Sequence, residues 1–301
     1  MAGFKNHRDV HRAITEGRIF RSNFRKNANA GTQAQQWADL TRSPGNPGPF
    51  YYASAPMTFA PMSASTHGGI PHGRPVAPAK KHLHRLWWLP YSNESQAGML
   101  VDVLGYVPFV PQDDPGSDMA IDFNVTNKPA RWGNGDGIVM YLEIAAPHAG
   151  IGGNTIEVTY TNGAGVSKVT GPGYLQGSST TNGGLLLLST GSVSSTIIPQ
   201  GPFFGLANGD DSIQSAQSIK VTGPGDIGLA TLVFARIVAD FPAHVGGLAG
   251  WPLVGGESVF GGKTSPMLPV VDDDAFLSIL INAQRTTLTQ VFGQADFIWS
   301  D

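Results

Sequence analysis

The sequence predicts an all-β protein, with a β-sandwich or jelly-roll body that follows a long extended N-terminal arm. Its 301 residues include 39 Gly and 22 Pro but only 14% charged residues, a composition typical of short strands joined by turns. Short runs of alternating apolar residues recur from residue 82 onward. A basic, Pro/Gly-rich stretch without periodicity precedes them. We therefore expect an arm over residues 1–81 and a body over residues 82–301.

The body is expected to centre on residues 218–238, which have the pattern of two strands joined by a tight turn at 222–226. The first run alternates apolar and polar side chains. The second run, 229–238, is apolar on both faces, with Val233 pointing one way and Phe234 the other. A strand with two apolar faces must be covered on both sides, so this strand is predicted to lie between packed layers.

Other apolar runs predict the remaining strands. They lie at 82–91, 100–111, 119–126, 138–146, 185–190, 195–200, 202–208, 276–283 and 286–299, with a hairpin over 156–170 that turns at 162–165. A Gly/Pro-rich excursion over 242–271 interrupts the sheet pattern. Its length is typical of a segment with a role in contact or assembly. No apolar run is long enough to span a membrane, and the charged N-terminus does not predict a signal peptide.

The expected arm begins with one short basic helix within 7–27, where Val10, Ala13 and Ile14 have helical spacing. Residues 28–81 have no periodicity, but they carry more aromatic and Met side chains than a flexible linker does. They could form a disordered tail, or an extended arm whose apolar side chains fill pockets on another subunit. The aromatic content favours the second interpretation.

Charge is distributed unevenly along the chain. Residues 1–90 carry 12 of the 19 basic residues and 3 of the 22 acidic ones, a balance of +9, whereas residues 91–301 have a balance of −12. This polarity predicts that the arm lies against an acidic surface, which could belong to its own body, a neighbour or nucleic acid.

Candidate catalytic and metal motifs are weak. The chain has no Cys, which excludes disulfides, thiolate metal sites and a cysteine nucleophile. The tripeptide at 262–264 lacks the first Gly of a phosphate-binding loop, because Glu257 stands there. His82 and His84 share one face of an expected strand, but the neighbouring basic residues favour surface histidines over metal ligands.

The acidic clusters at 113–118, 210–211 and 272–274 are interpreted as solvated turns, since none has the regular alternation of a calcium-binding loop. The sequence thus predicts no catalytic, cofactor or metal site, and no enzyme.

Binding to another protein is the expected role of the arm. Its bases are interleaved with Phe and could also follow a phosphate backbone, but the basic stretch runs directly into an apolar one, which favours a protein partner over nucleic acid. The residues expected to make the contact are Arg8, Arg12, Arg18, Phe20, Arg21, Phe24, Arg25, Lys26, Phe50, Tyr51, Tyr52 and Phe59.

Two segments, VDVLGYVPFVPQDD (101–114) and SIQSAQSIKVTGPGDIGLATLVFARIV (212–238), resemble virion structural proteins of tailed bacteriophages, in which a jelly-roll-like body follows an N-terminal arm. The resemblance covers residues 80–301 and includes no catalytic motif. It implies a virion component. We expect a capsid decoration or cement protein, a homotrimer that binds the major capsid protein or other virion subunits.

Two alternatives belong to other classes. One is a tail or head–tail protein with a carbohydrate-binding β-sandwich, whose exposed aromatic residues would be Trp87, Trp88, Trp132 or Trp251. The other is a polysaccharide-degrading enzyme, which needs two close carboxylates in a cleft.

Overall fold

The computed structural model describes residues 4–27, 36–90, 96–146, 154–174, 201–244, 254–255, 268–283 and 290–300. These residues form three antiparallel sheets with one short α-helix and three 3₁₀ turns, so the predicted all-β, sandwich-like class is confirmed. None of the helices in the described part of the chain is long and apolar enough to cross a membrane.

The sheet that holds both chain termini is called the terminal sheet here. Its strand order is β14 (Val254–Gly255), β5 (Lys81–Pro90), β17 (Gln290–Trp299), β1 (Ile19–Asn27) and β3 (Gly45–Asn46), and β15 (Val270–Val271) also pairs with β5.

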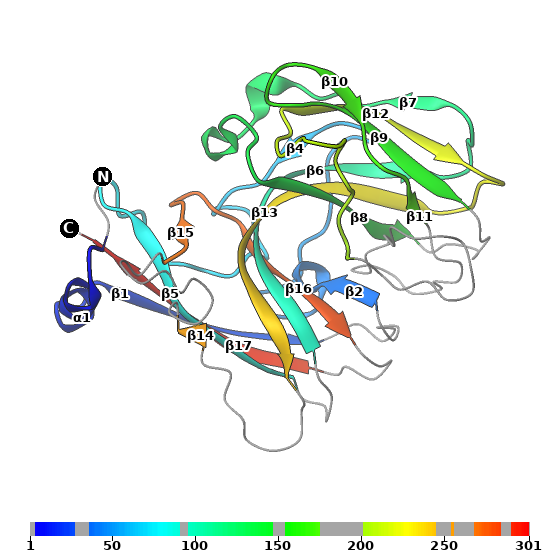
Figure 1. Ribbon diagram of the computed structural model, residues 1–301. Helices are drawn as coiled ribbons and strands as arrows, with labels where there is room; N and C mark the ends of the chain where they lie inside the picture. The colour runs from blue at the N-terminus through cyan, green and yellow to red at the C-terminus, as the bar shows by residue number, and fades with distance from the viewer. Residues whose placement is uncertain are drawn as a thin grey trace.

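The other two sheets lie beyond it in a row (Figure 1). The central sheet has the order β2 (Gln36–Asp39), β16 (Leu277–Ala283), β6 (Gln96–Pro111), β13 (Leu229–His244) and β8 (Ile138–Ala146), with β4 (Ala60–Pro61) paired to β6. The outer sheet has the order β10 (Ser167–Val169), β9 (Thr155–Thr161), β12 (Ser215–Thr222) and β7 (Asp118–Ala120), with β11 (Gly173–Tyr174) paired to β9. The 3₁₀ turns are η1 (Leu40–Arg42), η2 (Val125–Asn127) and η3 (Ala130–Trp132).

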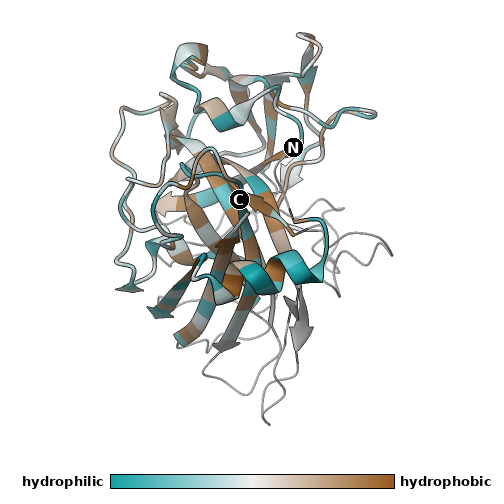
Figure 2. Cartoon of the chain, turned by 90° about the vertical axis from the view of Figure 1, so that its left-hand side faces the viewer, coloured by the Kyte–Doolittle hydropathy of each residue, from teal (hydrophilic) through white to brown (hydrophobic). Residues whose placement is uncertain are grey.

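Helix α1 (His7–Thr15) confirms part of the predicted basic helix. The Asn6 side chain caps it by accepting from the Asp9 amide, and the helix ends just before Gly17, whose φ of 76° favours glycine. Val10 and Ala13 pack against Ile298 of the terminal sheet. Figure 2 shows the helix on the outside of the molecule, with hydrophilic stretches facing the viewer.

The expected extended arm is wrong for residues 19–27. These residues form β1, which pairs with β17 through nine consecutive residue pairs within the same chain. Phe24 is 3% exposed and belongs to the main core. Its ring lies over Gly293, where a Cβ would come within 2.0 Å of the ring, so the two strands fit closely. In β1 the exposed residues Arg21, Asn23 and Arg25 alternate with the buried residues Ser22, Phe24 and Lys26, so one face of the strand is buried.

Residues 37–62 are likewise not an arm, because they pair with the central sheet through β2 and β4 and cover one of its faces. Phe50 contacts the rings of Tyr106 and Phe276 at 5.7 and 5.9 Å, and Tyr52 contacts Tyr106 at 4.7 Å. Met62, 2% exposed, joins the same cluster. The aromatic and Met side chains that distinguish this segment from a linker therefore fill pockets on its own subunit.

The two apolar faces predicted for 229–238 are confirmed. Phe234 lies in the main core and Val233 in the second cluster, both at 1% exposure or less. Ile237 departs from the pattern, since it is 44% exposed.

The predicted hairpin over 218–238 is wrong, because β12 belongs to the outer sheet and β13 to the central sheet. The connecting residues pack on the β6–β7 turn instead: the Gly116 amide donates to Val221 and the Asp226 amide to Gln112. Gly223, Gly225 and Gly228 all have positive φ, which lets the chain turn out of one sheet and into the next.

Other strand predictions have mixed outcomes. The hairpin predicted at 156–170 is confirmed as β9 and β10, and the Asn162 side chain accepts from the amides of Ala164 and Val166 in its turn. Of 119–126 only the start is a strand, and 202–208 is not one. The excursion at 242–271 contributes to β13, β14 and β15, which corrects the expectation that it interrupts the sheets. The runs at 185–190 and 195–200 lie outside the described residues.

Replacing Phe24 with Ala tests whether β1 is an integral strand. We expect the free energy of unfolding to fall by about 3–5 kcal/mol, because the ring is buried against Gly293. Urea denaturation followed by circular dichroism measures this change. Asn23→Ala, on the exposed face of the same strand, is the control and should cost less than about 0.5 kcal/mol. Equal effects from the two variants would contradict the placement of β1.

Candidate functional site

The residues predicted to bind a partner separate into two groups. Phe24, Lys26 and Phe59 are buried, and Arg18, Phe20, Phe50 and Tyr52 are half-buried, in contacts within the chain. Arg8, Arg12, Arg21, Arg25 and Tyr51 are exposed. Most of the aromatic side chains predicted to contact a partner thus pack within their own subunit. Four of the predicted arginines and Tyr51 stay exposed.

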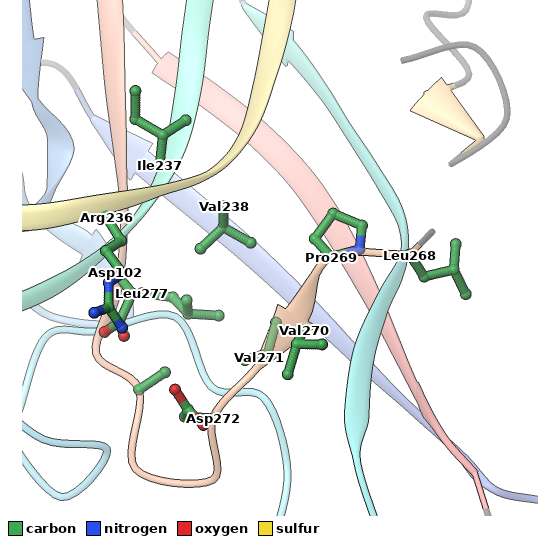
Figure 3. A pocket seen from close by; sticks show the side chains of 11 residues that line it. Asp102, Arg236, Ile237, Val238, Leu268, Pro269, Val270, Val271, Asp272 and Leu277 are labelled. Atoms are coloured by element: carbon green, nitrogen blue, oxygen red, sulfur yellow. The ribbon is translucent and has the colours of Figure 1, made fainter. Parts of the chain in front are cut away.

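A cavity of about 510 Å³ lies between β13, β15 and the start of β16. Most of its wall is apolar, and two of its residues, Ile237 and Val270, are 44% and 52% exposed. Asp102 and Arg236 lie together at one end, and Asp272 lies on the loop near them (Figure 3). Such a lining fits an apolar group better than a charged substrate.

Asp102 forms one wall of this cavity and is held by Arg131. Arg131 Nε lies 2.9 Å from Asp102 Oδ2, and both side chains are under 10% exposed. The same guanidinium pairs with Asp274 and donates to the backbone oxygens of Met62 and Val103. Burial raises the pKa of Asp102, while Arg131 acts in the opposite direction. Arg131 therefore ties together the N-terminal segment, β6 and the 272–275 loop.

A second buried tie involves Lys81, His72 and Asp273. Lys81 Nζ lies 3.0 Å from His72 Nδ1 and 3.0 Å from Asp273 Oδ1, and His72 Nε2 lies 2.9 Å from the Ala275 oxygen. Burial, and then the charge of Lys81, lowers the pKa of His72. Burial acts to raise the pKa of Asp273, but hydrogen bonds from Lys81 and two backbone amides hold it below its usual value.

A third tie joins η1 to the central sheet. Asp39, 2% exposed, accepts from the Thr41 amide, the Ser278 hydroxyl and the Tyr141 hydroxyl. Glu143, 0% exposed, accepts from Tyr52 and pairs with Arg42. Burial raises the pKa of Tyr141 well above its usual value, with a further contribution from Asp39.

Lys26 adds a cation to this third tie. Its Nζ lies 3.3–3.5 Å from the backbone oxygens of Thr41, Ser43 and Gly48, and burial lowers its pKa to about 8. The groups that bind Asp39 and Glu143, together with the Lys26 cation, fix the N-terminal segment on the central sheet. Because both carboxylates are buried, a substrate cannot reach them.

Within the described ranges, no group of three or more His, Asp or Glu side chains is arranged to hold a metal ion. His82 is 8% exposed, with Nδ1 3.1 Å from the Leu268 oxygen, so the expectation of a surface histidine is wrong there. The reason is that α1 and the adjoining Phe4 cover this end of the terminal sheet, and the Phe4 ring lies 5.2 Å from His82. The tripeptide at 262–264 lies outside the described residues.

The candidate glycan-binding residues do not form an exposed aromatic face. Trp132 and Trp88 are 1% and 8% exposed and lie in the core, which corrects their candidacy. Trp87 is half-buried, and Trp251 lies outside the described residues. Among the acidic clusters, 113–118 is largely exposed as expected, whereas Asp210 binds Tyr160 and Asn162, and Asp273 binds Lys81.

No protein-family model matches the chain, and no curated protein matches it. Among solved structures, the chain is similar to the VP2 subviral particle of infectious bursal disease virus, with 9% identity, a TM-score of 0.20, and coverage of 93% of this chain and 80% of that one. The Gt strain of the same virus gives 10% identity, a TM-score of 0.19, and coverage of 94% and 81%. TM-scores this low do not establish a common fold.

The fold and the site together define a class. This is a mostly β, sandwich-like protein of antiparallel sheets, in which buried charged groups act as ties between segments. Its cavity has the apolar lining of a contact site.

Removing the Arg131 side chain tests the first tie. Arg131→Gln leaves Asp102 and Asp274 without their cation, and we expect the free energy of unfolding to fall by about 3 kcal/mol or more, measured by urea denaturation. The matched control is Arg12→Gln, whose ion pair with Glu16 is about half exposed and should contribute less than about 1 kcal/mol. A loss no larger than that of the control would contradict the structural role.

Acidification tests the second tie. His72 has a lowered pKa in the folded protein, so below about pH 6.5 the unfolded chain binds protons that the folded chain does not. The free energy of unfolding should therefore fall as the pH drops through about 6.5, and His82 and His84, whose pKa values burial also lowers, act in the same direction. Urea denaturation at several pH values measures the loss. His72→Asn should lose less stability on acidification than the wild type, and identical pH profiles would refute the assignment.

Proposed function

We propose that this protein is a structural subunit of a virus particle, which acts through its contact surfaces. The observation that carries the proposal is the use of the buried charged side chains. Arg131, Lys81, Asp39 and Glu143 each bind groups from distant segments of the same chain, as parts of a rigid body do. The resemblance of residues 101–114 and 212–238 to virion structural proteins supports the same role.

The finer assignment is a decoration or cement protein on the capsid of a tailed bacteriophage, assembled as a trimer and bound to the major capsid protein. It rests on the sequence resemblance. The residues available for such a contact are the exposed members of the predicted set, among which Tyr51 has a large side chain that is 64% exposed.

Quantitative mass spectrometry of purified particles tests the particle role. A structural subunit should be present at a fixed ratio to the shell protein, in tens of copies or more. An enzyme or accessory factor would be absent or present in a few copies, and that result would overturn the proposal.

An occupancy assay tests the contact. Purified protein is added to particles that lack it, and bound copies are counted. We expect Arg8→Glu/Tyr51→Ser to lower occupancy at least about tenfold at limiting concentration, because an exposed Tyr and Arg are the residue types that dominate contact energies. Val125→Ser, at a position that is 54% exposed near the outer sheet, is the control. Unchanged occupancy of the double variant would exclude Arg8 and Tyr51 from the contact.

A further inference from the structure

The outward face of the terminal sheet combines arginines with aromatic side chains. Three strands, β1, β17 and β5, place their residues in rows across this face. The rows are Arg21–Asp296–Arg85, Asn23–Gln294–Trp87 and Arg25–Phe292–Leu89. The opposite face carries Phe24, Ala295 and Leu86 and lies in the main core. Arg21, Asn23 and Arg25 are exposed, and Arg85, Trp87 and Phe292 are half-buried.

The cations on this face exceed the acids. Asp296 binds Arg21 at 3.0 Å and is the one acidic residue in the three rows. Arg85 forms no ion pair with any described carboxylate, and its Nε is buried without a hydrogen-bond partner in the described part of the chain. A buried guanidinium N–H without a partner is costly, and an anion that reaches it would satisfy it.

Each aromatic residue of this face has an arginine as a neighbour. The Arg25 guanidinium is 5.3 Å from the centroid of the Phe292 ring, so the two form a cation–π contact. Trp87 follows Arg85 by two residues and faces the same way. Half-buried rings flanked by arginines are the arrangement that holds unpaired bases by stacking and their phosphates by charge.

Helix α1 extends the positive surface at one end of this face. Lys5, Arg8 and Arg12 are exposed on or beside it, against the two acids Asp9 and Glu16 of the same region. The exposed acidic turn with Asp113, Asp114 and Asp118 leads instead into β7 of the outer sheet, beyond the central sheet (Figure 1). The molecule is therefore polarised, with its basic surface on the terminal sheet.

We propose that the outward face of the terminal sheet binds single-stranded nucleic acid, with Arg21, Arg25 and Arg85 on phosphates and with Trp87 and Phe292 as stacking surfaces. The sequence had favoured a protein partner because the basic stretch runs into apolar residues. The structure removes that reason, because those apolar residues pack inside the subunit and leave the arginines outside. The inference concerns the isolated protein and does not depend on a role in a particle.

Fluorescence anisotropy with a labelled oligothymidylate of about 30 nucleotides tests the proposal. Such an oligonucleotide exceeds the ~4–16 nucleotides that a single β-barrel module covers. We expect binding that weakens as salt rises from about 50 to about 200 mM, with a slope of roughly −2 in log K against log salt for three phosphate contacts. Absence of binding at the lowest salt would overturn the proposal.

Matched variants locate the surface. Arg25→Gln/Arg85→Gln should weaken binding at least about tenfold and reduce the salt slope by about 1.4. Lys168→Gln/Lys220→Gln removes the same charge from the outer sheet and should bind like the wild type. Thermal melting confirms that each variant is folded. Equal losses from the two double variants would overturn the assignment to the terminal sheet.

Two further measurements separate stacking from charge. Trp87→Leu should weaken binding of the oligothymidylate about fivefold or more, with little change in binding of a DNA duplex, whose bases cannot stack on the ring. Polyglutamate of similar charge should compete much less well than unlabelled oligothymidylate. Equal competition by polyglutamate would mean that the face binds acidic polypeptides, and would overturn the proposal.

Discussion

The need to cover both faces of β13 determines much of this structure. Its residues alternate between two apolar clusters, so neither face can be left in water without losing the transfer free energy of large side chains such as Phe234 and Val233. The main core covers one face. The other is covered by residues 37–62, and so the N-terminal segment is part of the folded body. β1 is also part of the folded body: it lies in the terminal sheet and contributes Phe24 to the main core.

Two of the three buried ties lie where this cover meets the sheets, and the third joins His72 and β5 to the 272–275 loop. Arg131 binds the Met62 oxygen, Lys81 binds Asp273, and Asp39 of the N-terminal segment binds Tyr141 and Ser278. The short strands β2, β3 and β4 fix only parts of this segment through ladder hydrogen bonds. Charged groups with defined geometry fix the rest, and because each has at least one charged or hydrogen-bonding partner, none of these charged groups is buried unpaired.

Local pattern in the sequence was enough to predict the all-β class, the two-faced strand at 229–238 and the hairpin at 156–170, because each depends on neighbouring residues. The pairing of β12 and β13 could not be predicted, since it depends on the contact of 223–228 with the turn after β6. The cover formed by residues 37–62 was also missed, because an irregular segment has no periodicity to detect. The sequence contains one indication of the contact between Asp102 and Arg131. Asp102 is the one charged residue in the otherwise mostly apolar run 96–111.

Residues 19–27 and 37–62 are folded into the body and do not form an extended arm, so the charge asymmetry of the sequence has a different meaning. An extended basic arm with apolar residues would need an acidic protein surface with pockets. Once those apolar side chains are buried in their own subunit, the pockets are filled and the charge stays outside, ordered by the strands β1, β17 and β5. A sheet holds arginines at a regular spacing with rings between them, whereas a flexible arm must lose conformational entropy to do the same. The positive charge of the N-terminal region is thus held on a preorganised surface. The partner that such a surface fits best is a chain with regularly spaced negative charge and flat bases.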